Sequence, residues 1–409
     1  MLDTTIQTEI EKIYIIQPIF GNDYKALQKE AEALIESAGA VCAGTIYQNI
    51  KEINPATFIG PGKLTELKER LSGLSVTVLF NGDLTPSQTL NISTALSGLK
   101  VIDRTTLILD IFARNAKSNE GKLQVELAQL KYLFPRLRGK GIGLSRLGGG
   151  IGTRGPGETK LETDRRKIRL RISHLQDKID ELATRRNLTT ERRRKNNANT
   201  IALIGYTNVG KSTLLNRLTE SEVYADDRLF ATLDTTSRKL LINTREFILT
   251  DTVGFLRELP HHLISAFQST LESALRCDLL LLVCDASSDY ETQLNTTLSV
   301  LKDLDCRVPY LLVMNKSENM ADHAAFPSNS IFVSAKTGAG TEKLKAEILR
   351  FFNKENVDCT LQVPYTSFSD YVKLKKMINE LSVQFKDEYI EIRASIPNIY
   401  INKFSRYRI

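Results

Sequence analysis

Residues 205 to 212 have the residue types and the spacing that bind the phosphates of a nucleotide. They read GYTNVGKS, a G-x-x-x-x-G-K-[ST] phosphate loop between an apolar run (201 to 204) and a helical pattern (213 to 218). In such a loop the backbone N–H groups point at the phosphates, and the N-terminus of the helix favours anions. We therefore predict that the phosphates contact Gly205, Tyr206, Thr207, Asn208, Val209, Gly210, Lys211, Ser212 and Thr213.

The side chains of this loop imply phosphoryl chemistry that depends on Mg²⁺. Lys211 would reach the β- and γ-phosphates, and the Ser212 hydroxyl would hold the metal. A second motif, Asp251-Thr252-Val253-Gly254, follows an apolar strand and supplies a carboxylate for the metal shell and a glycine N–H that can sense the γ-phosphate. Mg²⁺ is therefore the predicted cofactor.

Two further motifs indicate which base the bound nucleotide carries. Asn315-Lys316-Ser317-Glu318 resembles the Asn-Lys-x-Asp box that binds guanine, and Ser334-Ala335-Lys336 resembles the last box of the same fold. A carboxylate that faces N1–H and the 2-amino group selects guanine, because adenine lacks both donors. Glu318 is one methylene longer than the usual Asp, so the strength of the selection and the use of ATP stay open. Four motifs in this order predict GTP and GDP as ligands.

A threonine-rich run between the first two motifs is expected to close over Mg²⁺ when the γ-phosphate is present. We choose Thr232 as the metal ligand, with Thr235 and Thr236 as alternatives. The segment adds Phe230, Ala231, Leu233 and Asp234 to the predicted nucleotide contacts. The predicted catalytic residues are then Lys211, Thr232 and Gly254, and the predicted metal ligands are Ser212, Thr232 and Asp251.

Phe255 occupies the position where many small GTPases place the glutamine that orients the attacking water. We therefore expect slow hydrolysis by the isolated protein. Asn208 matches the position at which some GTPases with this hydrophobic replacement bind K⁺, a charge that could act where an arginine finger would. The alternative, in which Asn208 only hydrogen-bonds its own loop, fits the sequence equally well.

The rest of the chain predicts the elements that position these motifs. Residues 11 to 112 alternate short apolar runs with amphipathic helical patterns, which is typical of a small parallel α/β domain, predicted over 1–115. No catalytic cluster is recognisable in it, and we interpret Asp103-Arg104 as a surface ion pair. A P-loop GTPase domain (198–355) and a small C-terminal α/β domain (356–409) follow. The latter is predicted as a strand, a helix over 370–381 and two strands.

A helical hairpin with a basic loop is predicted between the first two domains, over 116–197. Two apolar series with coiled-coil spacing indicate antiparallel helices: Leu123, Leu127, Leu130 and Phe134, then Ile168, Ile172, Leu175, Ile179 and Leu182. The loop between them, 139–157, is too rich in glycine to pack. Residues 131–195 carry a net charge of +12, whereas the whole chain carries +7. We predict RNA contacts from Arg138, Lys140, Arg146, Gly148, Gly149, Gly150 and Arg154.

Length and composition fit a cytoplasmic protein. The chain has 409 residues, of which 42% are hydrophobic, enough for about two to four domain cores. Its five cysteines form no C-x-x-C pair, which argues against a disulfide framework and a zinc site. The N-terminus lacks a signal-peptide pattern, and no apolar run is long enough to span a bilayer. We expect a monomer without a transmembrane segment.

The motifs together resemble the HflX family of ribosome-associated GTPases, over roughly residues 10 to 350. The resemblance is carried by RLGGGIGTRGPGETKLETDRRKIRLRI, with ELAQLKYLFPRLRG before it and GYTNVGKS, FATLD and DTVGF after it. The glycine-rich segment is more specific than the GTPase boxes. The resemblance implies binding to the large ribosomal subunit, a loop directed toward the peptidyl-transferase centre, separation of stalled ribosomes under stress, and stimulation of GTP hydrolysis by ribosomal particles. Glu318 departs from the family's usual Asp.

Two other functions remain open from the sequence. A GTP-dependent factor for ribosome assembly or RNA modification would bind precursor particles and leave assembled ribosomes intact. A signalling switch would have a protein partner, and loss of the glycine-rich loop would leave that partner bound.

Overall fold

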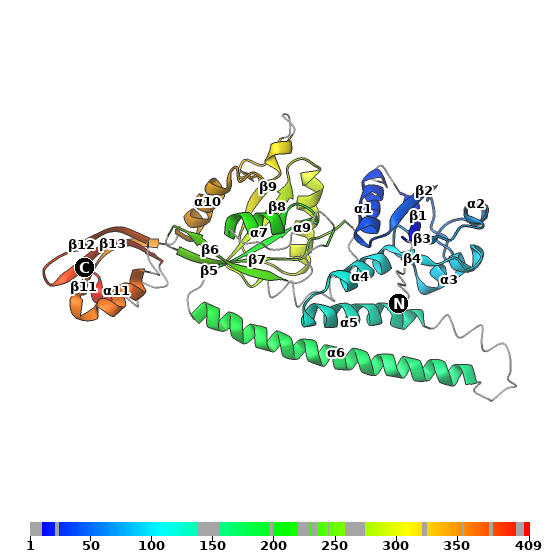
Figure 1. Ribbon diagram of the computed structural model, residues 1–409, viewed down its shortest axis with the longest axis horizontal. Helices are drawn as coiled ribbons and strands as arrows, with labels where there is room; N and C mark the ends of the chain where they lie inside the picture. The colour runs from blue at the N-terminus through cyan, green and yellow to red at the C-terminus, as the bar shows by residue number, and fades with distance from the viewer. Residues whose placement is uncertain are drawn as a thin grey trace, which may run out of the picture. The chain divides into compact units, whose positions relative to one another are not determined.

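The structure is a computed structural model, and Figure 1 shows its elements along the chain. It describes residues 10–20, 24–137, 156–195, 199–219, 229–230, 235–243, 245–257, 275–320, 325–353, 356–375, 379–397 and 405–409. The predicted α/β class is confirmed: a parallel α/β domain with a helical hairpin is followed by a P-loop GTPase domain and a small C-terminal sheet with one helix.

A four-stranded parallel sheet forms the first domain, in the order β2-β1-β3-β4. Strands and helices alternate along the chain: β1 (Lys12–Ile19), α1 (Tyr24–Ser37), β2 (Val41–Asn49), α2 (Pro61–Leu71), β3 (Thr77–Phe80), α3 (Pro86–Ala95), β4 (Val101–Asp103) and α4 (Arg104–Asn115). The apolar runs of the sequence are the strands, and their side chains form a core with the helices, for example Ile16, Phe80 and Ile92. Local signals start the helices, since Thr85 and Gln88 form a capping box at α3.

Asp103 and Arg104 do not form a surface ion pair, so that prediction was wrong. Both residues are buried, with 1% and 2% of their surfaces exposed. Asp103 caps α4 by accepting from the backbone N–H of Thr106 (2.9 Å) and pairs with Arg136 (3.0 Å). Arg104 pairs instead with Glu30 of α1. The sequence could not show this burial, because it results from the packing of α1 and α5 against α4.

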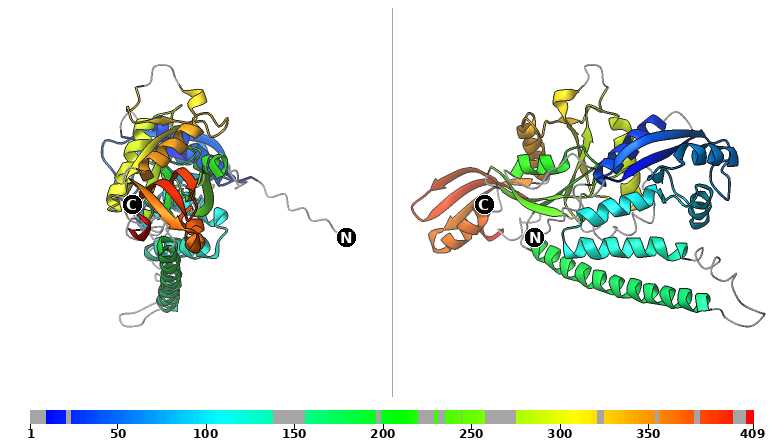
Figure 2. Two further views of the ribbon diagram at one scale, coloured as in Figure 1. Left: turned by 90° about the vertical axis from the view of Figure 1, so that its left-hand side faces the viewer. Right: turned by 45° about the vertical axis from the view of Figure 1, so that its right-hand side comes forward.

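The predicted hairpin consists of α5 (Asn119–Arg136) and α6 (Pro156–Lys195), which run side by side in opposite directions (Figures 1 and 2). Six of the nine predicted apolar residues form its seam: Leu127, Leu175 and Ile179 are buried, and Leu123, Leu130 and Ile172 pack against them. Phe134, Ile168 and Leu182 are not part of this cluster. An ion pair between Glu126 and Arg171 (2.7 Å) joins the helices outside the seam. The predicted RNA-binding residues, Arg138, Lys140, Arg146, Gly148, Gly149, Gly150 and Arg154, lie outside the described residues.

A six-stranded sheet in the order β10-β9-β8-β5-β7-β6 forms the GTPase domain. Its elements are β5 (Asn199–Gly205), α7 (Lys211–Thr219), β6 (Thr236–Ile242), β7 (Arg245–Asp251), β8 (Leu279–Asp285), α9 (Tyr290–Asp303), β9 (Tyr310–Asn315), η2 (Ser317–Asn319), β10 (Ile331–Phe332) and α10 (Thr341–Asn353). Only β6 is antiparallel to its neighbour. All seven residues of β8 are buried, as expected for a strand covered on both faces.

The C-terminal sheet has the antiparallel order β11-β13-β12. Its elements are β11 (Asn356–Pro364), η3 (Tyr365–Ser367), α11 (Phe368–Lys375), β12 (Asn379–Phe385), β13 (Tyr389–Pro397) and η4 (Ser405–Tyr407). The helix predicted over 370–381 was therefore wrong at its end, because 379–381 belong to β12. Asn379 and Glu380 pair with Ser395 and Ala394, so hydrogen bonds to the neighbouring strand β13 prevail over the local apolar pattern.

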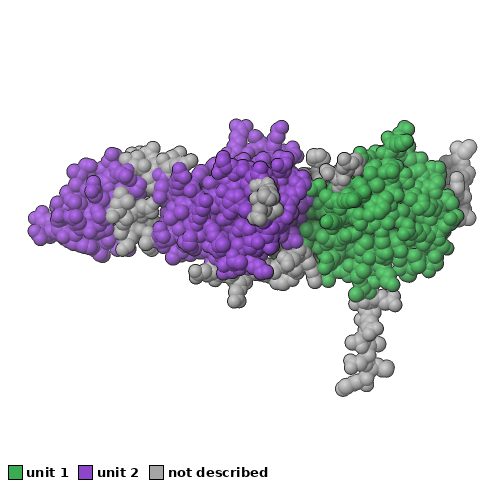
Figure 3. All heavy atoms as spheres, turned by 90° about the horizontal axis from the view of Figure 1, so that it is seen from above, with its two compact units in different colours: residues 1–186, 226–234, 256–271 green, residues 187–225, 235–255, 272–409 purple. Residues whose placement is uncertain are grey.

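The chain divides into two compact units (Figure 3). Unit 1 contains residues 1–186, 226–234 and 256–271, and unit 2 contains 187–225, 235–255 and 272–409. Two segments that flank GTPase motifs in sequence are thus part of the N-terminal unit. The domain boundaries predicted at 115, 197 and 355 stay predictions. Within the described residues, no helix has both the length and the apolar character needed to cross a bilayer.

Candidate GTP-binding site

The phosphate loop joins β5 to α7, so the predicted residues 205–213 bring backbone N–H groups to the start of a helix. The loop depends on left-handed backbone at Asn208 (φ 59°) and Gly210 (φ 85°). A side chain at Gly210 would put its Cβ atom 2.4 Å from Nδ2 of Asn315. Glycine is therefore required at this position for both backbone conformation and space.

Lys211 is buried at the first turn of α7, with 7% of its surface exposed. Its ammonium group donates to the carbonyl oxygens of Tyr206 (2.7 Å) and Gly205 (3.3 Å). Burial lowers the pKa of Lys211 to about 8, while the nearby Asp251 carboxylate opposes the shift. A buried cation with only weak neutral acceptors is a favourable binding partner for phosphate oxygens.

Two of the three predicted metal ligands are in direct contact. Ser212 Oγ donates to Oδ2 of Asp251 over 2.6 Å, and Asp251 is fully buried at the end of β7. A hydroxyl and a carboxylate oxygen are the hard ligands that Mg²⁺ prefers. In the described parts of the chain no group of three or more His, Cys, Asp and Glu side chains gathers. The pair therefore fits a metal that takes its other ligands from phosphate oxygens, as in P-loop proteins.

Gly254 and Phe255 lie directly against the phosphate loop. A Cβ atom at Gly254 would come within 2.7 Å of Thr207 Cα and 2.9 Å of Lys211 Nζ. The backbone of Phe255 donates to Gly205 O (3.1 Å) and accepts from Thr207 N–H (2.7 Å), and its ring is buried. Phe255 thus ties two motifs together, a role that the sequence did not reveal.

Other residues of the second motif stabilise the same region. Thr252 is buried and donates from Oγ1 to the carbonyl oxygen of Leu203 (2.7 Å), and Val253 is buried beside it. The second motif is thereby fixed to β5 and the phosphate loop.

One side chain connects the phosphate loop to both base-binding motifs. Asn315 donates from Nδ2 to Val209 O (2.7 Å), and its Oδ1 accepts from the backbone N–H of Ala335 (2.9 Å). Lys316, in left-handed backbone (φ 59°), donates from Nζ to Asn208 O (2.8 Å). The structure therefore brings the phosphate loop together with two base-binding motifs that lie more than a hundred residues further along the chain.

The other predicted base-binding residues surround this connection. Ser317 and Glu318 lie in η2, where Glu318 is exposed, and Ser334 is buried and accepts from the N–H of Thr337 (3.0 Å). Lys336 is exposed. An exposed carboxylate at Glu318 is accessible to a base.

Both interpretations of Asn208, as a K⁺ ligand and as a residue that only hydrogen-bonds its own loop, stay predictions. Its carbonyl oxygen accepts from Lys316, but among the described residues no group hydrogen-bonds its side-chain amide. Asn208 is exposed.

The switch segment is only partly described. Ala231, Thr232, Leu233 and Asp234 lie outside the described residues. Phe230 belongs to unit 1, where its ring packs against the ring of Phe112. Its side chain therefore already has a packing partner in that unit.

Sequence reasoning missed two supporting residues. Asp285, at the end of β8, accepts from Lys316 Nζ (2.8 Å) through Oδ2. The sequence did contain a signal for this residue, because an acidic residue directly after a fully apolar run lies at the end of a buried strand. Arg217 of α7 donates to Ala335 O (3.1 Å), and nothing in its local sequence distinguishes it from a surface arginine.

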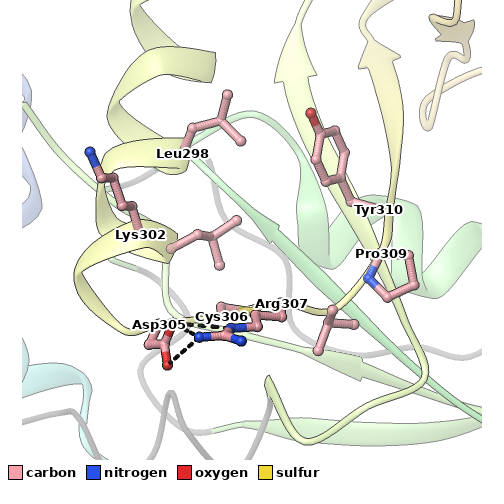
Figure 4. Close-up of a pocket in the computed structure, with 9 residues that line it drawn as sticks. Leu298, Lys302, Asp305, Cys306, Arg307, Pro309 and Tyr310 are labelled. Carbon is pink, nitrogen blue, oxygen red and sulfur yellow. Dashed lines mark hydrogen bonds and ion pairs between the residues drawn. The ribbon is translucent and has the colours of Figure 1, made fainter.

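A shallow groove elsewhere in this domain is separate from the site. It lies between the end of α9 and the start of β9 and is lined by residues that include Lys302, Asp305 and Tyr310 (Figure 4). The nucleotide motifs follow the carboxyl ends of the parallel strands, whereas Tyr310 begins β9. The groove is therefore at the opposite edge of the sheet.

Comparisons with known proteins agree with this geometry. Three family profiles match consecutive parts of the chain: GTP-binding GTPase N-terminal (residues 25–113), GTP-binding GTPase Middle Region (115–193) and 50S ribosome-binding GTPase (200–316). GTPase HflX of Caldanaerobacter subterraneus is 45% identical over 94% of this chain and 91% of its own length. GTPase HflX of Escherichia coli is 43% identical over 88% of this chain and 86% of its own length. Similarity of this extent shows that the chain belongs to the HflX family of GTPases.

Proposed function

We propose that this protein hydrolyses GTP, binds the RNA of the large ribosomal subunit through its basic glycine-rich loop, and separates stalled ribosomes in the cytoplasm. Hydrolysis would then release it. The observation that supports this most directly is the combination of a phosphate site built on Lys211, Ser212 and Asp251 with a long hairpin. Helix α5 ends just before the glycine-rich loop, and helix α6 begins at its other end.

The nucleotide chemistry follows from the positions of the side chains. Lys211 exchanges its two carbonyl acceptors for phosphate oxygens, which restores a strong partner to a buried charge. Ser212 and Asp251, together with Thr232, would hold Mg²⁺, which neutralises charge on the β- and γ-phosphates when it is bound. Gly254 offers its N–H beside Lys211, where the γ-phosphate is expected.

Hydrolysis by the isolated protein should be slow. The Phe255 backbone is held by Gly205 and Thr207, and its buried ring has no group that could orient water. K⁺ at the Asn208 amide would supply a positive charge near the phosphates. The large subunit would activate turnover by ordering the Thr232 segment.

The hairpin itself favours the loop as the RNA-binding part. Arg165 and Arg169 of α6 stack over Phe134 of α5, with centroid distances of 5.1 and 5.6 Å, so these two arginines stabilise the hairpin. The arginines predicted for RNA are those of the loop. Glycines there would allow close approach of the backbone to a crowded RNA surface.

Sedimentation of assembled ribosomes tests the proposal. We expect the parent protein with a non-hydrolysable GTP analogue to convert 70S particles into subunits. A protein with Gly148, Gly149 and Gly150 changed to alanine should still bind GTP but separate fewer particles. Matched changes of Gly60 and Gly62 to alanine, which have open space around them, serve as the control.

The result also decides between the alternatives. Binding to precursor particles without any loss of 70S would support an assembly or RNA-modification factor. Unchanged ribosome separation by the triple alanine variant would show that the loop is a passive connector.

A further inference from the structure

The turn that carries Glu318 has a backbone conformation that other contacts must maintain. Lys316 begins the turn in the left-handed region, with φ at +59°, and Ser317–Asn319 form the single turn of η2. A left-handed conformation is unfavourable for a lysine and persists where the surrounding structure fixes it. Glu318 is exposed, so packing of its own side chain does not fix the turn. The neighbouring elements therefore have to hold it in place.

Strand β10 is the first of these elements. The backbone N–H of Ser317 donates to the carbonyl oxygen of Val333, directly after β10, over 3.2 Å. β10 has two residues and lies at the edge of the sheet, next to β9. Ile331 and Val333 are buried in the core of the domain, and strand alternation places Phe332, which is half-buried, on the opposite face. The position of the turn therefore depends on the contacts of Phe332 as well as on the core.

Two further rings pack against Phe332. The rings of Phe332 and Phe326 meet edge to face, with centroids 5.1 Å apart, and Phe326 also packs against Tyr290, with centroids 4.8 Å apart. The Tyr290 hydroxyl donates to the carbonyl oxygen of Ala325, directly before Phe326. Ring pairs of this kind stabilise a structure beyond the area that they bury. We call Tyr290, Phe326 and Phe332 the Phe326 cluster.

Helix α9 connects the Phe326 cluster to the other side of the same turn. Tyr290 is the first residue of α9, and Gln293, one turn later, accepts from the backbone N–H of Asp285 over 2.8 Å. The Asp285 carboxylate pairs with Nζ of Lys316, also over 2.8 Å. All of these residues belong to unit 2. The first turn of α9 is thus linked to both ends of the turn that carries the base-binding carboxylate.

We propose that Tyr290 and Phe326 are positioning residues of the base site, which hold the Glu318 carboxylate where it accepts from both N1–H and the 2-amino group of guanine. The inference rests on the recognition of guanine predicted for Glu318. Hypoxanthine differs from guanine only in lacking the 2-amino group. The ratio of the affinities for GDP and for inosine diphosphate (IDP) therefore measures how well the carboxylate is placed.

Calorimetry of GDP and IDP binding to the full chain tests the proposal. We expect the parent protein to prefer GDP by about tenfold or more, as for one hydrogen bond to a charged group. Phe326→Leu removes both ring pairs and should reduce this preference by about threefold, the scale of one aromatic pair, because GDP is weakened more than IDP. Tyr290→Phe removes only the hydroxyl and should change the preference less, in the same direction; it carries the test if Phe326→Leu does not fold.

Phe351→Leu is the matched control for the loss of a ring. It removes a comparable edge-to-face pair with Phe352, whose centroid lies 5.2 Å away at the end of α10 in the same unit. We expect it to keep the preference of the parent protein for GDP. A reduced preference in this control would show that loss of any ring pair in the domain has the same effect, and the proposal would be wrong.

Glu318→Ala is measured alone and combined with Phe326→Leu. Support requires that Glu318→Ala abolish the preference for GDP and that Phe326→Leu change it no further, because both act through one carboxylate. If Glu318→Ala abolishes the preference but Phe326→Leu and Tyr290→Phe weaken GDP and IDP equally, or leave both unchanged, the cluster supports the fold alone. The proposal is then wrong, and the role of Glu318 stands. If Glu318→Ala leaves the preference unchanged, the predicted role of Glu318 fails and the proposal fails with it.

Discussion

Nucleotide binding should take up a proton at Lys211 above pH 8. Burial holds the pKa of Lys211 at about 8, and its present acceptors are the carbonyl oxygens of Gly205 and Tyr206. Phosphate oxygens stabilise the charged form, so the pKa should return to the ordinary range of about 10.4 or higher in the complex. The phosphates do not titrate in this window, since their second pKa is about 6.

The size of the effect follows from the two pKa values. At pH 8.5 roughly a quarter of the free protein carries the proton on Lys211, and nearly all of the complex does, so binding takes up roughly 0.7 proton. At pH 6.5 Lys211 is protonated in both states, so the proton uptake at Lys211 is roughly zero. The sign also predicts that affinity for GDP falls as pH rises above 8, because the complex binds more protons than the free protein.

Calorimetry in two buffers with different ionisation enthalpies measures this uptake. Lys211→Arg is the matched control, because arginine keeps its charge throughout this pH range and leaves any titration of the guanine base unchanged. We expect the parent to exceed the arginine variant by roughly half a proton or more at pH 8.5 and to match it at pH 6.5. Equal proton uptake by the two proteins at pH 8.5 would refute the argument that Lys211 is desolvated in the free protein and regains its charge when phosphate binds.

Three further predictions concern the motifs and the loop. Gly254→Ala should weaken the GTP analogue about tenfold more than GDP in a fluorescence titration, as for one lost hydrogen bond to a charged group. Its Cβ would lie 2.7 Å from Thr207 Cα and 2.9 Å from Lys211 Nζ, so the Gly254 N–H, which is expected to contact only the γ-phosphate, would have to move; equal losses for both nucleotides would contradict this. Glu318→Asp should tighten GDP binding by up to ~1 kcal/mol, through a better charge-assisted hydrogen-bond pair with guanine. Calorimetry measures this change. An unchanged affinity for GDP, together with ATP binding as tight as GTP binding, would mean that Glu318 does not recognise the base. Arg146→Ala with Arg154→Ala should lower the slope of log K against log salt for ribosome binding by roughly 0.7 to 0.9 per lost phosphate contact, and an unchanged slope in co-sedimentation would exclude these contacts.

The chemistry of the site could be read from the sequence because it is local. The phosphate loop works through eight consecutive residues, and the apolar strand before it and the helix after it are also visible in the sequence. The hairpin seam could also be predicted from the sequence, because coiled-coil spacing indicates which residues face the partner helix. Leu127, Leu175 and Ile179 are buried there. In both cases the information lies within a few turns of chain.

Errors arose where a local pattern competed with strand pairing or with packing against other helices. The apolar spacing over 370–381 favoured one helix, yet Asn379 and Glu380 pair with β13. Asp103 and Arg104 were interpreted as a surface ion pair, and their burial depends on helices that come from other parts of the chain. The local propensity for helix or strand predicts structure poorly at such positions, because packing and strand pairing contribute more free energy than local preference.

Only the tertiary structure could decide which residues support the motifs. Asn315 bonds to Val209, 106 residues away in sequence, and Asn115 bonds to Phe230 over a separation of 115 residues. Neither asparagine has a local signal for its partner, because one amide can bond to any carbonyl that folding brings within about 3 Å. The sequence by itself predicted which residues act on phosphate and metal, and the fold decided which parts of the chain hold those residues in place.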